Sequence, residues 1–201
     1  MTDESKSINS LEILYKDFYH PNPNINFHAC REMAKYWPKE SMQRLIDNLS
    51  GEDVELRRKS VRCLGCFGEK VFFPVSKLFY SSNNLITQIS CIKVFVKLAS
   101  DMQPDKFPEE LFDIINIAIK DEEPQMILVI VSLLRQLDYI GKPYLQALCR
   151  DSNLLKARAS VTAISELRDS SISNFLIELS EDKSIDPFIR EAAYCVTSMK
   201  K

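Results

Sequence analysis

The chain is poor in the residues from which self-contained active sites are built. Of its 201 residues only two are histidines, His20 and His28, and only four are glycines. Histidine is the usual general base and a frequent metal ligand, so two of them leave little from which to assemble such a site. The scattered glycines form no phosphate-binding loop, and no Gly-x-Ser-x-Gly turn occurs. We therefore predict no catalytic residue in this chain.

An excess of one charge and long apolar runs are also lacking. The net charge is −2 and the isoelectric point about 5.8, which gives no general attraction to a nucleic-acid backbone. The longest apolar run, Met126 to Val131, has six residues, whereas a membrane span needs roughly 20. The first ten residues have no apolar core of the kind a signal peptide requires. We expect no nucleic-acid partner, no membrane span and no export by a signal peptide.

The cysteines do not form a pattern that binds metal. There are six of them: Cys30, Cys63, Cys66, Cys91, Cys149 and Cys195. Most lie in apolar helical stretches, and a chain of this length can bury a core without disulfides, so they predict reduced thiols in a cytosolic compartment. Cys63 and Cys66 have the Cys-x-x-Cys spacing, but no second pair completes a tetrahedral set. We predict no metal site.

What the chain does contain is a repeat. Six small polar or acidic residues act as anchors: Asn22, Asp53, Asn84, Glu123, Asn153 and Asp186. Seven positions after each anchor stands a residue that is small in five of the six repeats, and eleven positions after it one that is mostly large and apolar. The first two gaps between anchors are 31 residues, and the later gaps are 39, 30 and 33. Such periods predict an all-α fold, an α-solenoid of HEAT-like (armadillo-type) helix pairs with about five to six repeats.

The second repeat shows how a unit is built. Asp53 is placed to cap a helix over 54–67, and Gly68 is placed to end it. A second helix is predicted over 72–80. The terminal elements differ, as the capping helices of a solenoid do: a helix over 10–20 follows a flexible segment 1–9, and a single helix over 187–199 follows the last anchor. We predict a single repeat domain over 1–201.

The third gap is eight residues longer than the first two, and the extra length falls at 99–108, which we predict as a loop insertion. Acidic residues dominate this loop and the helix that follows it. Two interpretations remain open: a solvated bend between two halves of the solenoid, or a hinge or contact loop.

Three groups of residues are candidates for binding. Arg57, Arg58 and Arg62 concentrate guanidinium groups that suit carboxylates, although Arg57 could instead pack against an acid such as Asp53. Trp37, in the turn between two helices, is either an interface residue or packed against the N-terminal helix. A row of second helices could line the inner face of the array and present further side chains. These are Arg44, Lys77, Tyr80 and Tyr144.

Several stretches resemble one known family. They are His20 to Asn24, Gly51 to Val54 followed by Arg57 to Gly65, Lys106 to Leu111, and Pro187 to Ala193. In these the chain resembles the HEAT-like E/F family of cyanobacterial and red-algal phycobilin lyases, in particular members associated with phycoerythrin. The Asp-x-x-Leu-Arg-Arg core is generic to HEAT repeats, whereas the Lys-Phe-Pro-Glu-Glu loop after a lengthened repeat is more specific. The likeness runs from about Leu11 to Met199.

The resemblance implies a role in assembling a light-harvesting protein. Members attach an open-chain tetrapyrrole to a cysteine of a phycobiliprotein through a thioether, or act as chaperones of that subunit, and many work in pairs. The implied substrate is a bilin of the phycoerythrobilin type, with no permanently bound cofactor. The implied partners are a phycoerythrin subunit and a second E/F-type lyase subunit in a heterodimer. The implied location is the cyanobacterial cytosol or the plastid stroma, and Arg57, Arg58 and Arg62 would be partners of the bilin propionates.

Two alternatives stay open at this point. The sequence does not decide between a lyase subunit and a non-catalytic chaperone, since repeats three and four carry Gln88 and Ile127 where the family has arginine. A HEAT-type scaffold that binds an unrelated protein is the other possible function.

Overall fold

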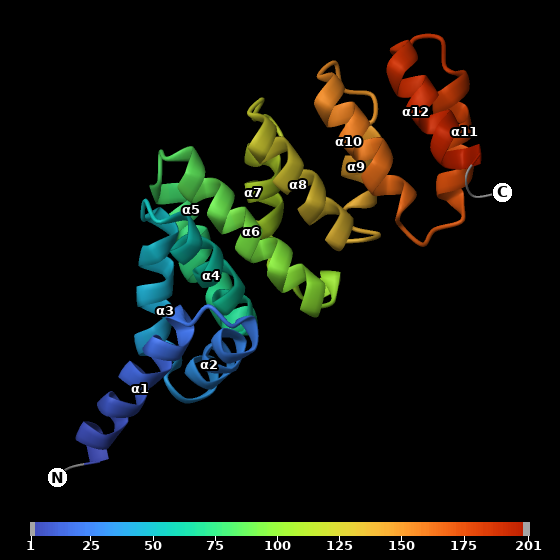
Figure 1. The fold of residues 1–201 in the computed structure, drawn as a ribbon. Helices are drawn as coiled ribbons and strands as arrows, with labels where there is room; N and C mark the ends of the chain where they lie inside the picture. Colours follow the sequence, from blue (N-terminus) through green and yellow to red (C-terminus); the bar gives the residue numbers. More distant parts are fainter. Residues whose placement is uncertain (1–2, 199–201) are drawn as a thin grey trace. The chain divides into compact units, whose positions relative to one another are not determined.

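The computed structural model describes residues 3–198, and this part of the chain is built entirely from helices (Figure 1). The all-α repeat fold predicted from the sequence is thereby confirmed. The α-helices are α1 (Asp3–Tyr19), α2 (Pro23–Tyr36), α3 (Pro38–Asp47), α4 (Val54–Gly65), α5 (Phe72–Ser81), α6 (Leu85–Asp101), α7 (Glu110–Ala118), α8 (Pro124–Gln136), α9 (Lys142–Leu148), α10 (Leu154–Ser165), α11 (Ser171–Glu181) and α12 (Pro187–Ser198). The 3-10 helices are η1 (Asn48–Ser50), η2 (Gly68–Val71) and η3 (Pro104–Lys106).

The chain divides into two compact units, which we call unit 1 (residues 1–101) and unit 2 (residues 102–201). The division falls inside the predicted insertion 99–108. Residues 99–101 continue α6, and residues 104–106 form η3. The third predicted repeat is therefore shared, because its first helix α6 ends unit 1 and its second helix α7 begins unit 2. The single domain over 1–201 stays a prediction.

The anchors act as helix caps. Five of them, all except Glu123, accept hydrogen bonds of 2.8 to 3.2 Å on their side-chain oxygens from backbone N–H groups of the following first turn. These bonds satisfy donors that have no partner within the helix. Glu123 makes no such bond, and its own N–H donates to Asp121 instead. The repeat visible in the sequence is therefore largely a repeat of helix starts.

The small residues seven positions after the anchors are the points where first helices meet. All six of these residues are buried, from Ala29 in α2 to Ala193 in α12. In unit 1, α2 packs on α4 and α4 on α6; in unit 2, α8 packs on α10 and α10 on α12 (Figure 1). The second helices α3 and α5 touch more sparsely. In each unit the first helices therefore form the more closely packed row.

The N-terminal helix covers the first repeat, as predicted. It begins at Asp3, seven residues before the predicted start at Ser10, and its Tyr15 and Phe18 are buried. Two polar contacts fix its C-terminal end: the buried Asn26 side chain donates to the Phe18 carbonyl, and Lys59 Nζ donates to the Tyr19 carbonyl at 2.8 Å. Flexibility of residues 1–9 stays a prediction, and Met199 of the predicted last helix lies outside the described residues.

The second repeat agrees closely with its sequence-based prediction. Asp53 Oδ1 accepts from the Leu56 N–H at 3.0 Å. The helix ends at Gly65, two residues before the predicted end, and Gly68 follows with a φ of +61°. This left-handed backbone favours glycine, because other residues meet a steric clash there. The second helix runs from Phe72 to Ser81, one residue beyond the prediction.

Replacing the capping carboxylate tests this account of the repeats. Asp53→Ala removes the acceptor for the Leu56 N–H and should lower the free energy of unfolding by about 1 kcal/mol. Glu123→Ala, at the anchor that makes no capping bond, is the matched control and should change it by less than about 0.5 kcal/mol. Urea unfolding followed by circular dichroism measures both. Equal losses in the two variants would contradict the capping role.

Candidate functional site

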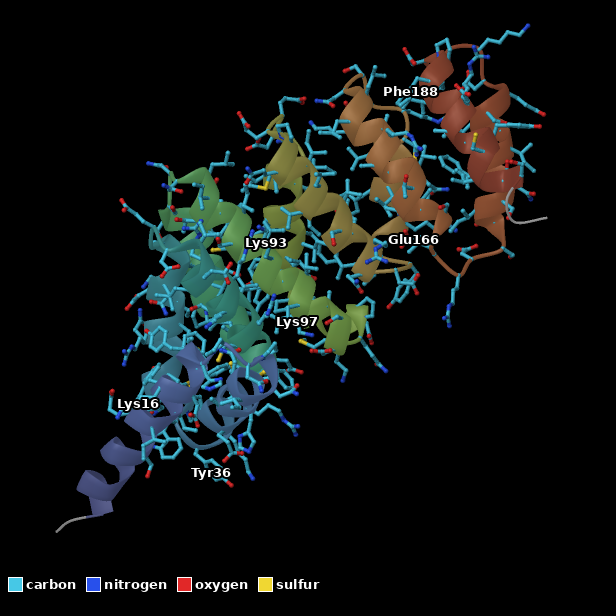
Figure 2. The ribbon with its side chains drawn as sticks, in the orientation of Figure 1. Lys16, Tyr36, Lys93, Lys97, Glu166 and Phe188 are labelled. Carbon is cyan, nitrogen blue, oxygen red and sulfur yellow. The ribbon has the colours of Figure 1, made fainter. Side chains whose placement is uncertain are left out.

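Unit 1 carries a line of unpaired cations along its row of first helices. Arg31 on α2, Arg62 on α4 and Lys93 on α6 each stand nine positions after their anchors, and we call these three residues the basic ladder. All three are exposed. Within the described part of the chain, none of their charged groups has an ion-pair or hydrogen-bond partner. Figure 2 shows Lys93 on α6, two turns after the start of that helix.

More positive charge lies beside the ladder. Burial lowers the pKa of Lys93, and the nearby charges of Arg58 and Arg57 on α4 lower it further. The first helices of neighbouring repeats therefore bring cations into electrostatic contact across α4 and α6. No acidic side chain of residues 3–198 forms an ion pair with Lys93, so an anion bound there would be attracted by several cations at once.

Lys97 lies on α6 (Figure 2), and its stem packs beside Gly65 of α4 in the preceding repeat. A Cβ atom added at Gly65 would lie 2.3 Å from Lys97 Cγ, so the lysine stem occupies the space that a side chain would need. The Lys97 ammonium pairs with Asp101 at 3.3 Å within its own helix. Because Gly65 has no side chain, the stem of Lys97 can lie against α4 at this point, one turn beyond Lys93.

Unit 2 uses its charges differently, to join two repeats. Four ion pairs with N–O distances of 2.5 to 2.6 Å connect the fourth repeat (α8 and α9, with their flanking loops) to the fifth (α10 and α11, with theirs). The pairs are Arg135–Glu166, Lys142–Asp169, Arg150–Asp182 and Lys156–Glu122. The Lys156 side chain is only 5% exposed, and Glu122 also accepts a hydrogen bond from Asn153. Among the described residues of unit 1, no ion pair joins two repeats in this way.

The composition of the two units follows the same division. Unit 1 has 14 lysines and arginines against 12 acidic residues, whereas unit 2 has 12 against 16. At the register position of the basic ladder, unit 2 carries Ser132, Thr162 and Cys195 instead of cations. The basic face is therefore a property of unit 1 alone.

The arginines predicted as binding residues have different surroundings. Arg57 Nη1 donates to the carbonyls of Gly51 and Glu52 at 2.5 and 3.1 Å, so it holds the loop before α4 rather than pairing with Asp53. Arg58 pairs with Glu55 at 2.9 Å in an exposed contact of low energy. Arg62 is exposed and has no partner in the described structure. A contact of these residues with bilin propionates stays a prediction.

Two other predicted residues lie near the N-terminal helix. The Arg44 guanidinium stacks 3.8 Å from the centre of the Tyr15 ring and lies 3.6 Å from a carboxylate oxygen of Glu12, both on α1. Trp37 is half-buried at the start of α3, and its ring meets that of Tyr36 edge to face with centres 5.8 Å apart. Arg44 is therefore engaged by the N-terminal helix, while a binding role for Trp37 stays a prediction.

The remaining candidates do not form one group. Lys77 and Tyr80 are exposed on α5, and the Tyr80 ring lies edge to face on Phe79. Tyr144 is half-buried on α9, in the other unit. The expectation that the second helices line the inner face stays a prediction, as does a binding role for Lys77, Tyr80 and Tyr144.

Sequence reasoning missed Arg31 and Lys93. It found Arg62 because that residue stands in a run of basic residues, whereas Arg31 and Lys93 stand alone in theirs. The signal that identifies them is their common position nine residues after an anchor. Comparing one register position across successive repeats would have revealed the ladder.

Burial favours the protonated form of four of the six thiols. Burial raises the pKa of Cys66 to about 11 and those of Cys91 and Cys149 to about 12. The pKa of the buried Cys63 is also raised, first by burial and then by the neighbouring Cys30. The thiolate is the nucleophilic form, so these four groups are unreactive near neutral pH. No group of three or more His, Cys, Asp or Glu side chains in residues 3–198 is arranged to hold a metal ion.

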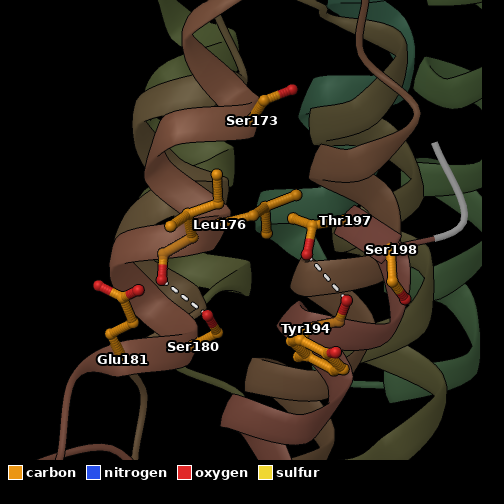
Figure 3. A pocket seen from close by; sticks show the side chains of 8 residues that line it. Ser173, Leu176, Ser180, Glu181, Tyr194, Thr197 and Ser198 are labelled. Carbon is orange, nitrogen blue, oxygen red and sulfur yellow. Dashed lines mark hydrogen bonds between the residues drawn. The ribbon is translucent and has the colours of Figure 1, made fainter. Parts of the chain in front are cut away.

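The last helix pair contains a hollow that the sequence did not indicate. It has a volume of about 370 Å³ and lies between α11 and α12 (Figure 3). Leu176 and Tyr194 line it together with several serines and Glu181, and the Tyr194 ring is 64% exposed. The hydroxyl groups of Ser180 and Thr197 donate hydrogen bonds to backbone carbonyls of their own helices. Glu181 is the one charged residue among the described residues that line the hollow, so this lining offers no charged pair that would fix a ligand.

None of the described helices combines the length and the apolar character that crossing a membrane demands.

Comparison with known proteins places the chain beside two curated sequences. It is 27% identical over 172 residues to "Bilin biosynthesis protein CpeZ" of Synechococcus sp. (strain WH8020), covering 81% of this chain and 91% of that protein. It is 26% identical over 188 residues to "Uncharacterized phycocyanin operon protein Z" of Pseudanabaena tenuis (strain PCC 7409), covering 92% of each. No family model matches. The resemblance predicted from the repeat and its loop is thereby confirmed.

Solved structures with similar helix arrangements include two engineered proteins. One is described only as an engineered protein, with 13% identity, a TM-score of 0.46 and coverage of 94% of this chain and 95% of that one. The other is a designed armadillo repeat protein, with 12% identity, a TM-score of 0.44 and coverage of 95% and 100%. At these scores the fold assignment depends on the helices of this chain, not on the comparison.

The ion pairs of unit 2 predict how stability changes in acid. Hydrogen bonds from Lys142 and Ser171 lower the pKa of Asp169 to about 2, and those from Ser184 and Arg150 lower that of Asp182 to about 2. Because an unfolded aspartate titrates near about 4, the stabilisation is complete above that pH and is lost as the pH falls towards about 2. The double variant Asp169→Asn, Asp182→Asn should lose less stability across this window than the wild type. Thermal melts at pH 7, 4, 3 and 2 measure the difference.

The control for this experiment is Asp105→Asn, Asp113→Asn, which removes two exposed acids of unit 2 that make no ion pair in the described structure. It should keep the wild-type loss between pH 4 and pH 2. If both double variants behave like the wild type, the pairs contribute nothing that acid removes.

Proposed function

We propose that this chain, which is similar to CpeZ, acts in the assembly of a phycobiliprotein, most specifically of phycoerythrin. In this role it holds the apo-subunit, the bilin or both while a cysteine of the subunit forms its thioether with the chromophore. The similarity to CpeZ over 81% of this chain and 91% of that protein is the observation that carries the proposal. That relative is named a bilin biosynthesis protein, and we infer a related role for this chain.

The chemistry of four of the six thiols, Cys63, Cys66, Cys91 and Cys149, supports a client-supplied nucleophile. Thioether formation adds a sulfur–hydrogen bond across a carbon–carbon double bond of the bilin: the sulfur bonds to one carbon, the proton ends on the other, and no oxidant or reductant is needed. The reacting sulfur must be accessible as a thiolate. Burial keeps Cys63, Cys91 and Cys149 protonated, and Cys66 is only partly exposed with its pKa raised to about 11. The contribution of this chain would then be to position two reactants.

The fold supports the same role. Stacked first helices present side chains from several repeats on one continuous surface, which suits a macromolecular partner better than a small pocket does. By resemblance a second E/F-type subunit would complete the functional unit, and a phycoerythrobilin-type bilin would be the chromophore. The reaction would take place in the cyanobacterial cytosol or the plastid stroma. Whether the chain is a lyase subunit or a chaperone is decided by the experiment below.

Co-expression with phycoerythrin subunits tests the proposal. The subunits are produced with a bilin source, with or without this chain, and in each case with or without a second E/F-type lyase subunit. We expect this chain to increase the soluble yield of one subunit, its zinc-enhanced bilin fluorescence on a denaturing gel, or both. Fluorescence that appears without the second subunit identifies a lyase. A gain in soluble subunit that leaves bilin attachment unchanged identifies a chaperone.

The matched control is Asp53→Ala with Leu64→Ala, which weakens the second repeat at its cap and in its core. It should reduce the effect in proportion to the loss of folded protein. No change in solubility or bilin attachment under any condition with the wild-type chain would contradict the proposal and favour a scaffold that serves an unrelated protein.

A further inference from the structure

The basic ladder is a row of cations in unit 1 that the contacts within the described structure leave unexplained. Arg31, Arg62 and Lys93 are exposed and have no partner in the described residues, although acids are plentiful in the sequence. In unit 2 the corresponding charges pair between repeats and so have a structural purpose. Burial lowers the pKa of Lys93, and the charges of Arg58 and Arg57 lower it further, so an anion bound beside Lys93 would be attracted by several cations.

The spacing of the ladder selects the kind of anion. Its three residues come from three successive packed helices at one register position. Helices in contact lie about 8–10 Å apart, so neighbouring cations are separated by about 10 Å and the whole ladder spans about 20 Å. A peptide in the extended polyproline II conformation advances about 3.1 Å per residue with three residues per turn, so carboxylates three residues apart lie on one face and repeat about every 9 Å. The two propionates of one open-chain tetrapyrrole would reach at most two neighbouring positions.

One end of the ladder also offers an aromatic contact. A hollow of about 370 Å³ on α2 is lined by Asn24, Phe27, His28, Arg31, Glu32 and Lys35, of which Glu32 is acidic. The Phe27 ring is 49% exposed there, next to the first cation of the ladder. An aromatic surface beside a guanidinium suits a large apolar side chain that is flanked by carboxylates.

We infer that the basic ladder and the Phe27 hollow are a docking surface for an extended acidic segment of a partner protein, with carboxylates about three residues apart and an apolar residue at one end. Each repeat contributes one cation, so the affinity grows with the number of repeats that the segment crosses. Charge pairing at an exposed surface speeds association and is weakened by salt. If the proposed function is correct, the segment belongs to the client subunit; that identification rests on the proposed function, whereas the docking itself does not.

The probe is a synthetic fluorescein-labelled peptide of twelve residues, with a leucine near one end and glutamate at every third position. Fluorescence anisotropy with the full chain at about 50 mM salt measures binding. We expect the triple variant Arg31→Ala, Arg62→Ala, Lys93→Ala to bind at least tenfold more weakly, and each single variant to lose a part of this. Phe27→Ala should weaken the leucine peptide and leave a peptide without leucine unaffected. Raising the salt to about 500 mM should abolish the difference between wild type and triple variant.

A second triple variant, Lys39→Ala, Lys70→Ala, Lys77→Ala, controls for net charge. It removes three exposed cations of unit 1 that lie outside the row of first helices, and Lys77 was itself a sequence-based candidate. It should keep wild-type affinity. Circular dichroism melts of both variants should match the wild type, because neither set makes a contact that holds the fold. The same peptide with glutamine for glutamate should bind neither wild type nor variant.

Three outcomes would overturn the inference. Equal weakening in both triple variants would mean that only net charge attracts the peptide. Ladder-dependent binding of biliverdin, a dicarboxylate tetrapyrrole, with none of the peptide would assign the surface to a small molecule. Ladder-dependent self-association in sedimentation, without peptide binding, would assign it to a second copy of this chain. Because peptide binding requires no phycobiliprotein, its failure and the failure of the co-expression test are separate results.

Discussion

The close approach of neighbouring first helices is the constraint on which the rest of the structure depends. It requires a small or compact buried residue in the middle of each first helix, at the same distance from the helix start in each repeat. A fixed helix start is therefore as necessary as a small residue, and the capping side chains supply it in five of the six repeats. Once both are set, every other position of the first helix acquires a fixed place on the shared surface.

The sequence predicted most of the fold because these requirements are local. A cap, a small residue seven positions on and an apolar residue eleven positions on can all be recognised within one repeat. The residues seven positions on are all buried, and so are those eleven positions on, except Thr197, which is partly buried. The start of α1 at Asp3 was missed, because a polar segment gives no periodic apolar signal. The division into two units at Asp101 falls in the segment 99–108, where the extra residues had left open a bend between two halves of the solenoid or a hinge.

The candidate site was harder to predict, because it is made of residues far apart in the chain. The basic run from Arg57 to Arg62 is easily recognised in the linear sequence. In the structure, however, Arg57 donates hydrogen bonds to backbone carbonyls and Arg58 pairs with Glu55. Arg31 and Lys93 are isolated in sequence and become neighbours of Arg62 only when helices stack. Some charges form structural ion pairs, as between the fourth and fifth repeats. Which charges do so depends on side-chain geometry between repeats, and the sequence of a single repeat does not contain it.

The glycine beneath Lys97 shows how far an uncharged position can influence a charged surface. The stem of that lysine occupies the space where a Gly65 side chain would stand, and its ammonium pairs with Asp101. Any larger residue at this position would displace the lysine and with it the electrostatic potential next to Lys93. In the evolution of such an array, the strength of a basic surface could thus be adjusted by the size of a neutral residue that never touches the ligand, without gaining or losing a single charge.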